Sequence, residues 1–192
     1  MGQIYIDDKK FEKEDFQEKP LLKGEYESCV FNNCNFLNAD ISGIGFIDCE
    51  FKDCYLSLTK LMKTTFREVK FKNCKMLGLH FENCNEFGLS FSFENCQLNH
   101  SSFYKTKIKK TIFKNTKLLE TDFTECDLTN SIFENCDLSG ALFDHTNIEK
   151  VDFRSSYNYS IDPEINRIKK AKFSALGVLG LLNKYDIEID NN

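Results

Sequence analysis

Several residue types and patterns are missing from this sequence. It contains no tryptophan, two prolines and nine glycines in 192 residues, and no stretch rich in proline, glycine or serine divides it. No apolar run approaches the roughly 20 residues that a membrane-spanning helix needs. The first sixteen residues lack the basic segment followed by an apolar segment that marks a secretory signal. We therefore expect one domain, without a membrane span, located in the cytoplasm.

Catalytic motifs are missing as well. The sequence has no GxSxG, HExxH, phosphate-binding-loop or GxGxxG pattern. Its three histidines, His80, His100 and His145, stand far apart in the chain. Asp122 and Glu125 could serve as acid and base only in a cleft that shifts a pKa, and nothing in the sequence indicates one. We expect a protein that is not an enzyme and that has no cofactor, metal or small-molecule substrate.

What the sequence does contain is a five-residue period. Large apolar residues occur at every fifth position from Phe11 to Phe81, and again from Phe93 to Phe153. Neither an α-helix, with a period of 3.6, nor a simple strand, with a period of 2, repeats in this way. Each five-residue unit is therefore interpreted as one side of a coil. The register slips by two residues near residues 85–92, which we interpret as a bulge or small loop.

A second position in each unit is small. It lies two residues before the large one and is mostly alanine, serine, threonine or cysteine, and all nine cysteines occupy it. Residues at this spacing in an extended segment share a face, so these side chains should point into the coil. The nine cysteines form no CxxC pair, and we expect buried, reduced thiols rather than a metal site.

Residues twenty apart match in type, which indicates four sides per coil. Phe31, Phe51, Phe71 and Phe91 form one column, and after the slip Phe93, Phe113, Phe133 and Phe153 form another. The sequence predicts an all-β fold, a right-handed quadrilateral parallel β-helix of about eight coils and about 38 Å length at 4.8 Å per coil. Residue types suited to tight corners follow the large residues by two positions at Asn33, Asp53, Asn73, Asn83, Asn95, Asn115 and Asn135.

Both ends of such a rod need caps, because open sheet edges promote aggregation. Residues 1–10 are expected to contribute an N-terminal cap strand at 3–7, residues 11–173 the coils, and residues 174–192 a C-terminal module. In that module Ser174 should cap a helix over 175–184, followed by a strand. The helix either forms a homodimer or folds back over its own last coil. The candidate dimer residues are Leu176, Val178, Leu179, Leu182, Ile187 and Ile189.

The charges form bands along the chain. Residues 1–51 have eleven acidic and five basic side chains, residues 52–119 have five acidic and thirteen basic ones, and residues 120–164 have eleven acidic and two basic ones. The basic lysines lie on several predicted sides, and the net charge of the chain is −5. Direct binding of nucleic acid is therefore not expected.

The repeats CDLTN, SIFEN, CDLSG and ALFDH (residues 126–145) resemble the A(D/N)LXX repeat of the pentapeptide-repeat family. The end of the chain, FSALGVLGLLNKYDIEI, is similar in layout to the C-terminal module of the quinolone-resistance (Qnr-like) branch. That resemblance implies a dimeric, negatively charged rod that resembles duplex DNA in outline. Such rods engage DNA gyrase or topoisomerase IV and protect these enzymes from quinolones or inhibit them.

Carried over to this chain, the resemblance requires carboxylates on the outer surface near the dimer centre. Nine acids of the C-terminal band avoid both inward positions and should face solvent: Glu120, Asp122, Glu125, Asp127, Glu134, Asp137, Asp144, Glu149 and Asp152. We expect them to form the partner-binding surface, which would compete with DNA by charge and shape. The alternative is a non-catalytic scaffold with another protein partner, because charged residues on a solenoid are commonly just solvated.

Overall fold

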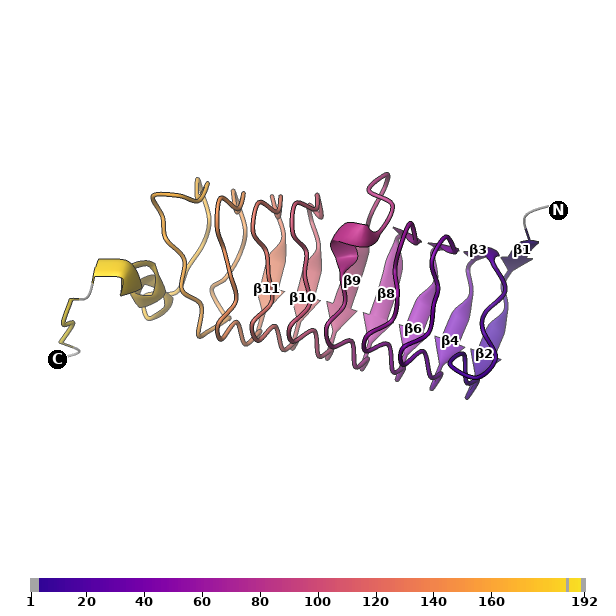
Figure 1. Ribbon diagram of the computed structural model, residues 1–192. Helices are drawn as coiled ribbons and strands as arrows, with labels where there is room; N and C mark the ends of the chain where they lie inside the picture. The colour runs from indigo at the N-terminus through magenta and orange to yellow at the C-terminus, as the bar shows by residue number, and fades with distance from the viewer. Residues whose placement is uncertain (1–3, 186, 191–192) are drawn as a thin grey trace.

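The computed structural model describes residues 4–185 and 187–190, and these residues form a rod of stacked coils with its two ends far apart (Figure 1). All strand pairs in this part of the chain are parallel. The strands are β1 (Ile4–Asp7), β2 (Lys10–Glu12), β3 (Gly24–Glu27), β4 (Val30–Asn32), β5 (Gly45–Ile47), β6 (Glu50–Lys52), β7 (Thr65–Arg67), β8 (Val69–Lys72), β9 (Phe91–Glu94), β10 (Ile112–Lys114) and β11 (Ile132–Glu134).

Each coil has four sides, which we number in chain order. The first side is the sheet β11-β10-β9-β8-β6-β4-β2. The second and third sides are held by isolated parallel bridges, such as Lys117 to Asp137 on the second and Asp122 to Leu142 on the third. The fourth side is the sheet β1-β3-β5-β7, which continues beyond β7 as bridges through Lys107, Asp127, Asn147 and Arg167.

The predicted β-helix is confirmed, but the number of coils differs. The longest sheet has seven strands, and the solenoid has about seven turns instead of the predicted eight. Beyond β11 the coil continues only as bridges, from Ile132 to Asp152 and from Asp152 to Lys172. The five-residue register fails at Asn158 and Pro163, and Tyr159 and Ile161 are buried there instead.

Stacked phenylalanine rings fill the interior of the rod. Phe113 and Phe133 stack with ring centroids 4.6 Å apart and planes 11° apart, whereas Phe103 meets Phe113 edge to face at 86°. Rings therefore stack along each side and pack in T-shaped pairs across corners, the two arrangements that aromatic quadrupoles prefer. Each fully buried phenylalanine stabilises the fold by roughly 1.5–3 kcal/mol.

The small inward position is occupied as the repeat predicts. Eight of the nine cysteines are buried, Cys84 is partly buried, and all nine are free thiols. Seven of the thiols point at backbone carbonyls of the preceding coil, as Cys54 Sγ does at the Phe31 oxygen at 3.3 Å. Burial raises the pKa of Cys126 to about 12, so this thiol stays protonated. The cysteines are core residues.

The corners require an unusual backbone. Of the seven predicted corner residues, all except Asn83 have positive φ values, and Asn83 lies in the 3-10 turn η1 (Phe81–Asn83). The corner between the first and second sides forms a ladder in which each side-chain amide donates to the residue one coil below. Asn115 Nδ2 donates to Asn95 Oδ1 at 3.1 Å, and Asn95 Nδ2 donates to Asn73 Oδ1 at 3.1 Å. Asparagine tolerates this left-handed conformation better than most residues.

The slip in register is a bulge on the fourth side, which projects from the rod beside η1 and β9 (Figure 1). Its ends rejoin the coil below, where Asn85 N donates to the Thr64 oxygen at 2.8 Å and Ser90 N to the Phe66 oxygen at 3.0 Å. Phe87 at its tip is 75 % exposed. The Arg67 guanidinium lies 5.5 Å from the centre of the Phe87 ring, a cation–π contact that supports the bulge from below.

The ends match the predictions only in part. At the N-terminus β1 pairs with β3, while Gln3 of the predicted strand lies outside the described residues. At the C-terminus the predicted helix over 175–184 is wrong, because the segment forms two 3-10 turns, η2 (Gly177–Leu181) and η3 (Asn183–Tyr185). The predicted final strand is also not found, because residues 187–190 are assigned to no strand.

Two glycines explain the 3-10 geometry. A Cβ on Gly177 would lie 1.9 Å from Tyr159 Oη, and one on Gly180 would lie 2.3 Å from the Tyr159 carbonyl oxygen. The segment thus packs directly on Tyr159, and its glycines disfavour a longer α-helix. Ser174 does act as a cap, since its Oγ accepts a hydrogen bond from Gly177 N at 3.0 Å. No helix among residues 4–185 and 187–190 is long and apolar enough to cross a membrane.

Candidate functional site

The nine predicted acidic site residues all lie on the surface, but not on one face. None of them is buried. The register of the bridges and strands assigns each acid to a side. Glu134 and Asp152 lie on the first side, Asp137 lies on the second, and Glu120 lies at the corner after the second. Asp122 and Asp144 lie on the third side, Glu125 lies at the corner after it, and Asp127 and Glu149 lie on the fourth side. The carboxylates therefore encircle the rod instead of forming a single stripe.

Four of these acids are paired with lysine or arginine. Glu125 lies 3.4 Å from Lys105, Asp127 lies 3.0 Å from Lys109, and Glu134 lies 4.0 Å from Lys114. Asp152 lies 2.8 Å from Arg154 and 3.6 Å from Lys172. The basic band lies one coil below the acidic one, so the two bands partly neutralise each other at their boundary.

The sequence indicates this pairing through the spacing of the charged residues, although counting acids and bases in successive segments of the chain does not reveal it. Lys105 and Glu125 are twenty residues apart, as are Lys114 and Glu134, and residues at that spacing stack in adjacent coils. Charges in a solenoid have to be compared by columns, because the nearest neighbours of a side chain lie one coil above and below it.

Three predicted acids have no ion pair among the described residues: Asp122, Asp137 and Glu149. Asp122 Oδ1 accepts a hydrogen bond from Thr124 N at 2.8 Å. Asp137 is partly buried, which raises its pKa, but bonds from Ser139 and Asn158 outweigh this and hold the pKa below its ordinary value. Asp137 is therefore ionised at neutral pH, and no ion pair within the described residues neutralises any of the three carboxylates.

Asp127 and Asp152 also have lowered pKa values. For Asp127 burial raises the pKa, and the hydrogen bonds from Thr129 and Lys109 lower it further than burial raises it. For Asp152 the largest cause is the hydrogen bond from Arg154, which lowers the pKa. Asp127 and Asp152 therefore remain negatively charged well below neutral pH.

The histidines lie on the outside, each beside a carboxylate. His80 Nδ1 is 2.8 Å from Glu82, His100 is 3.3 Å from Glu120, and His145 is 2.6 Å from Asp144. Their side chains are 61–70 % exposed. No group of three or more His, Cys, Asp or Glu side chains suited to a metal ion occurs within the described part of the chain.

The C-terminal segment folds back over the last coil of its own chain. Ile161 N donates to the Gly180 oxygen at 3.0 Å, and Lys184 lies 2.8 Å from Asp162 and 2.6 Å from Glu164. Tyr185 Oη donates to Glu164 at 2.8 Å. This fold-back was the alternative to dimerisation, and sequence reasoning did not identify the polar residues that fasten it.

Most of the predicted dimer residues nevertheless remain open to solvent. Leu176 is 77 % exposed, and Val178, Ile187 and Ile189 are 42–55 % exposed. Leu179 and Leu182 are partly buried, and Leu181 packs against the core. The cap thus covers the end of the rod with one face and presents apolar side chains on the other.

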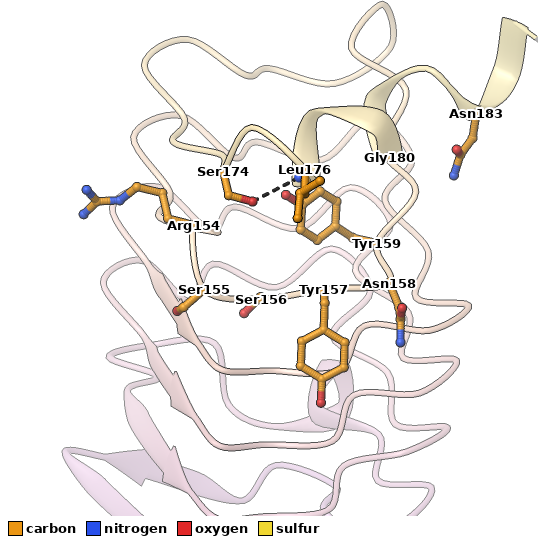
Figure 2. Close-up of a pocket in the computed structure, with 11 residues that line it drawn as sticks. Arg154, Ser155, Ser156, Tyr157, Asn158, Tyr159, Ser174, Leu176, Gly180 and Asn183 are labelled. Carbon is orange, nitrogen blue, oxygen red and sulfur yellow. Dashed lines mark hydrogen bonds between the residues drawn. The ribbon is translucent and has the colours of Figure 1, made fainter. Parts of the chain in front are cut away.

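A notch of about 420 Å³ lies where the cap meets the last coil (Figure 2). Figure 2 shows the Tyr159 ring pointing up toward residues 174–176, whereas Arg154 points away from the notch. Tyr159 is only 4 % exposed, and its hydroxyl has no hydrogen-bond partner among the described residues. The glycines of the cap enclose the hydroxyl. We therefore interpret the notch as part of the packing contact between the rod and the cap.

Comparison with known proteins places this rod in a family. The model of a pentapeptide repeat region matches residues 25–92 and 89–159. Among proteins of curated function, none matches this sequence. Two trypsin-treated variants of QnrB1, a plasmid-mediated fluoroquinolone resistance protein, match it in structure with TM-scores of 0.63 at 17 % identity. The first alignment covers 98 % of each chain, and the second covers 99 % of this chain and all of the other.

A third similar structure is HetL, a pentapeptide repeat protein involved in heterocyst differentiation regulation in Nostoc. Its TM-score is 0.42 at 10 % identity, and the alignment covers 88 % of this chain and 87 % of HetL. The coils, the inward ladders and the polar surface define a parallel β-solenoid built from five-residue sides. This chain belongs to the pentapeptide-repeat family.

Proposed function

We propose that this protein binds a type II topoisomerase, DNA gyrase or topoisomerase IV, and protects it from quinolones or modulates its activity. The observation that carries the proposal is the likeness in fold to QnrB1 over 98 % of both chains. The acidic surface of residues 120–164 supports it, because repeated carboxylates on a rod can occupy a groove built for the phosphates of duplex DNA. The role is one of binding, without catalysis.

Within that surface, Asp122, Asp137 and Glu149 are the residues expected to contribute most. They lack ion pairs among the described residues, so a partner's arginine or lysine does not have to displace an internal base. Glu125, Asp127 and Glu134 are already paired, and a partner would have to compete with their lysines.

The second candidate function is that of a scaffold that binds a different protein. The specific observation in its favour is the interleaving of charges: four of the nine acids are paired with lysine or arginine, and the basic band adjoins them. A surface of mixed sign is a poorer imitation of DNA than a uniformly acidic one. The two candidates make different predictions for gyrase.

The exposed apolar side chains of the cap support a homodimer in which two rods meet at their C-terminal ends. Leu176 and Val178 would form the centre of this contact, with Ile187 and Ile189 beside them. Exposed apolar residues clustered at one end of a small protein are typical of a contact surface. The nine free thiols further support a reducing compartment, and we propose that the protein acts in the cytoplasm.

The test is a DNA gyrase supercoiling assay titrated with the purified protein, with and without a quinolone. Restored supercoiling in the presence of drug, or inhibition in its absence, is the expected result. The variant Asp122→Asn/Asp137→Asn/Glu149→Gln should lose this effect, while Glu12→Gln/Glu14→Gln/Glu18→Gln at the far end of the rod removes the same charge and should retain it. No effect of the parent protein in either arm would overturn the topoisomerase proposal and favour the scaffold.

A further inference from the structure

The fourth side of the rod carries opposite charges on its two halves. Below the bulge, its outward positions and the corner that follows each strand hold six carboxylates and one guanidinium, that of Arg67. Lys23 and Lys63, at the corner before the strands, reduce the net charge of this half from −5 to −3. The carboxylates are Asp7, Asp8, Glu25, Glu27, Asp48 and Glu68. Each of the strands β1, β3, β5 and β7 is followed directly by an exposed corner residue. The carboxylates at these corners therefore lie along one edge of the fourth side, and the other carboxylates lie on its outer face.

Above the bulge the sign reverses. Lys107, Lys109 and Lys110 lie on the first coil there, and Lys150, Arg167, Lys169 and Lys170 lie nearer the C-terminus. Only Asp127 and Glu149 oppose them, which gives a net charge of +5. The remaining coils of the fourth side thus present a basic face of the same extent as the acidic one.

The acidic half is crowded and largely without internal partners. Only Asp48, 3.9 Å from Lys70, has an ion pair among the described residues of this set. Tyr5 donates a hydrogen bond to Glu27, and this bond, followed by burial and by the charges of Glu27, Asp7 and Glu25, raises the pKa of Tyr5 to about 12. Like charges this close together would be stabilised by an external positive surface.

We propose that two copies of this chain associate side by side and antiparallel through their fourth sides. A polyanion would be repelled by the acidic half, and a basic protein would be repelled by the other half. Only a surface with the same charges in reverse order complements both, and a second copy turned by 180° provides it. A parallel arrangement would oppose like charges, so charge also selects the orientation.

The bulge lies between the two halves, so the two-fold axis passes at its level. The exposed Phe87 of each copy then lies beside that axis. An apolar residue at the centre with charged residues around it follows the usual arrangement of protein interfaces. A side of five residues and about seven coils covers about 550 Å² per copy, at the low end for specific complexes, so the pairing should be weak and sensitive to salt.

The surface is separate from the apolar cap, so this pairing does not depend on the proposed C-terminal dimer. The two contacts respond differently to salt. Ion pairing weakens steeply as the Debye length falls from about 20 Å to about 4 Å between low and high ionic strength, whereas an apolar contact changes little. Association that disappears with added salt therefore reports the fourth side.

Corner positions offer variants that preserve the backbone. Asp8, Asp48 and Glu68 occupy the same corner column as Lys110, Lys150 and Lys170, and all six have positive φ values. Lysine and acidic residues are both accepted at such corners in this rod. The variant Asp8→Lys/Asp48→Lys/Glu68→Lys makes the lower half basic, and Lys110→Glu/Lys150→Glu/Lys170→Glu makes the upper half acidic. Each variant then carries one sign on both halves.

The test is sedimentation equilibrium at low and high salt for the parent, each triple variant, and their equimolar mixture. The parent should associate at low salt, with its association constant reduced at least about tenfold at high salt. Each variant alone should lose the salt-dependent association, and the mixture should regain it. The control Lys60→Glu/Lys75→Glu/Lys117→Glu, on the second and third sides, should behave like the parent.

Three results would overturn the proposal: a parent without salt-dependent association at about 100 μM, reversal variants that associate as the parent does, or a mixture that fails to recover. Circular dichroism and thermal unfolding of every variant check that the rod is intact. Association that has the same strength at low and high salt and in both variants belongs to the cap and would leave no role for the fourth side in self-assembly.

Discussion

Phe71 and Phe93 stack with ring centroids 5.3 Å apart and planes 10° apart, although they are separated by 22 residues instead of 20. The ladder of the first side is therefore continuous across the slip. The two extra residues are accommodated on the fourth side, where the chain leaves the coil at Asn85 and returns at Ser90. The rod tolerates an insertion at a corner because the stacked core does not have to shift.

Removing a ring from the ladder should destabilise the whole rod. Phe123 is fully buried and stacks on Phe103 and Phe143, both at 5.2 Å. Phe123→Ala should lower the free energy of unfolding by about 3–5 kcal/mol, through lost burial and the cavity left behind. Denaturant unfolding measures this. Phe87→Ala, at the exposed tip of the bulge, is the control and should change stability by less than about 0.5 kcal/mol. Equal stabilities would contradict the inward register.

The asparagine ladder separates backbone strain from hydrogen bonding. Asn95 has a φ of 54° and bonds to both Asn73 and Asn115. Asn95→Ala should cost about 1–2 kcal/mol for the left-handed backbone and up to about 1 kcal/mol for the lost bonds. Asn95→Gly loses the same bonds but accepts the backbone angle, so it should be the less destabilised of the two. Thermal unfolding that ranks them in the opposite order would refute this account of the corner.

Acidic residues of the C-terminal band should matter for binding and little for stability. Neutralising Glu125, Asp127, Glu134 and Asp137 together removes exposed or half-exposed charges, and each exposed ion pair contributes only about 0.2–1 kcal/mol. The fold should remain intact by circular dichroism. In the gyrase assay the activity of this variant should drop, chiefly through the loss of Asp137, but by less than in the Asp122/Asp137/Glu149 variant, and full retention of activity would reject an acidic-surface mechanism.

The cap should loosen in acid. Hydrogen bonds and the charge of Lys184 hold the pKa values of Asp162 and Glu164 below their ordinary values. A lowered folded-state pKa means that the contribution is complete above the ordinary pKa and is lost as pH falls through the lowered one. Methyl NMR signals of Leu179 and Leu182 should therefore shift as the pH falls below about 4.

The variant Lys184→Ala tests the cause of that shift. It removes the base between the two carboxylates, so it should produce at neutral pH the methyl shifts that the parent shows in acid. Lys169→Ala, on the fourth side, is the matched control and should leave the signals unchanged. Signals of the Lys184→Ala variant identical to the parent's at every pH would mean that the cap is held by its apolar contacts alone.

The end-to-end dimer depends on the exposed face of the cap. Leu176→Glu/Val178→Glu introduces charge at 77 % and 42 % exposed positions and should convert a dimer to a monomer without unfolding the rod. Light scattering at high salt, where ionic association is suppressed, measures the mass. Leu142→Glu, at a 56 % exposed position on the third side, should leave the mass unchanged. A parent that is already monomeric at high salt would refute the dimer.

Much of the fold could be predicted because a solenoid repeats one local rule. Each five-residue unit contacts its neighbours along the chain and one coil away, so the spacing of Phe31, Phe51 and Phe71 is itself the register of the ladder. The acidic site could be predicted only as a set of outward residues. The sequence did not show which of these carboxylates are neutralised, because that depends on ion pairs with Lys105, Lys109 and Lys114 in the coil below.

The C-terminal segment shows where this local reasoning ends. Its apolar spacing predicts an α-helix, but Gly177 and Gly180 lie against Tyr159 and the segment closes as 3-10 turns. That contact joins residues that lie outside the five-residue repeat, so the periodicity of the sequence does not predict it.

By itself, the sequence determined the β-helix, the inward thiols, the corner residues and the position of the slip, because each follows from a five-residue period that every coil must obey. Only the tertiary structure decided the form of the cap, the pairing of the acidic band and the opposed charges on the fourth side. These depend on which side chains meet across coils and at the end of the rod, where the repeat no longer dictates the neighbours.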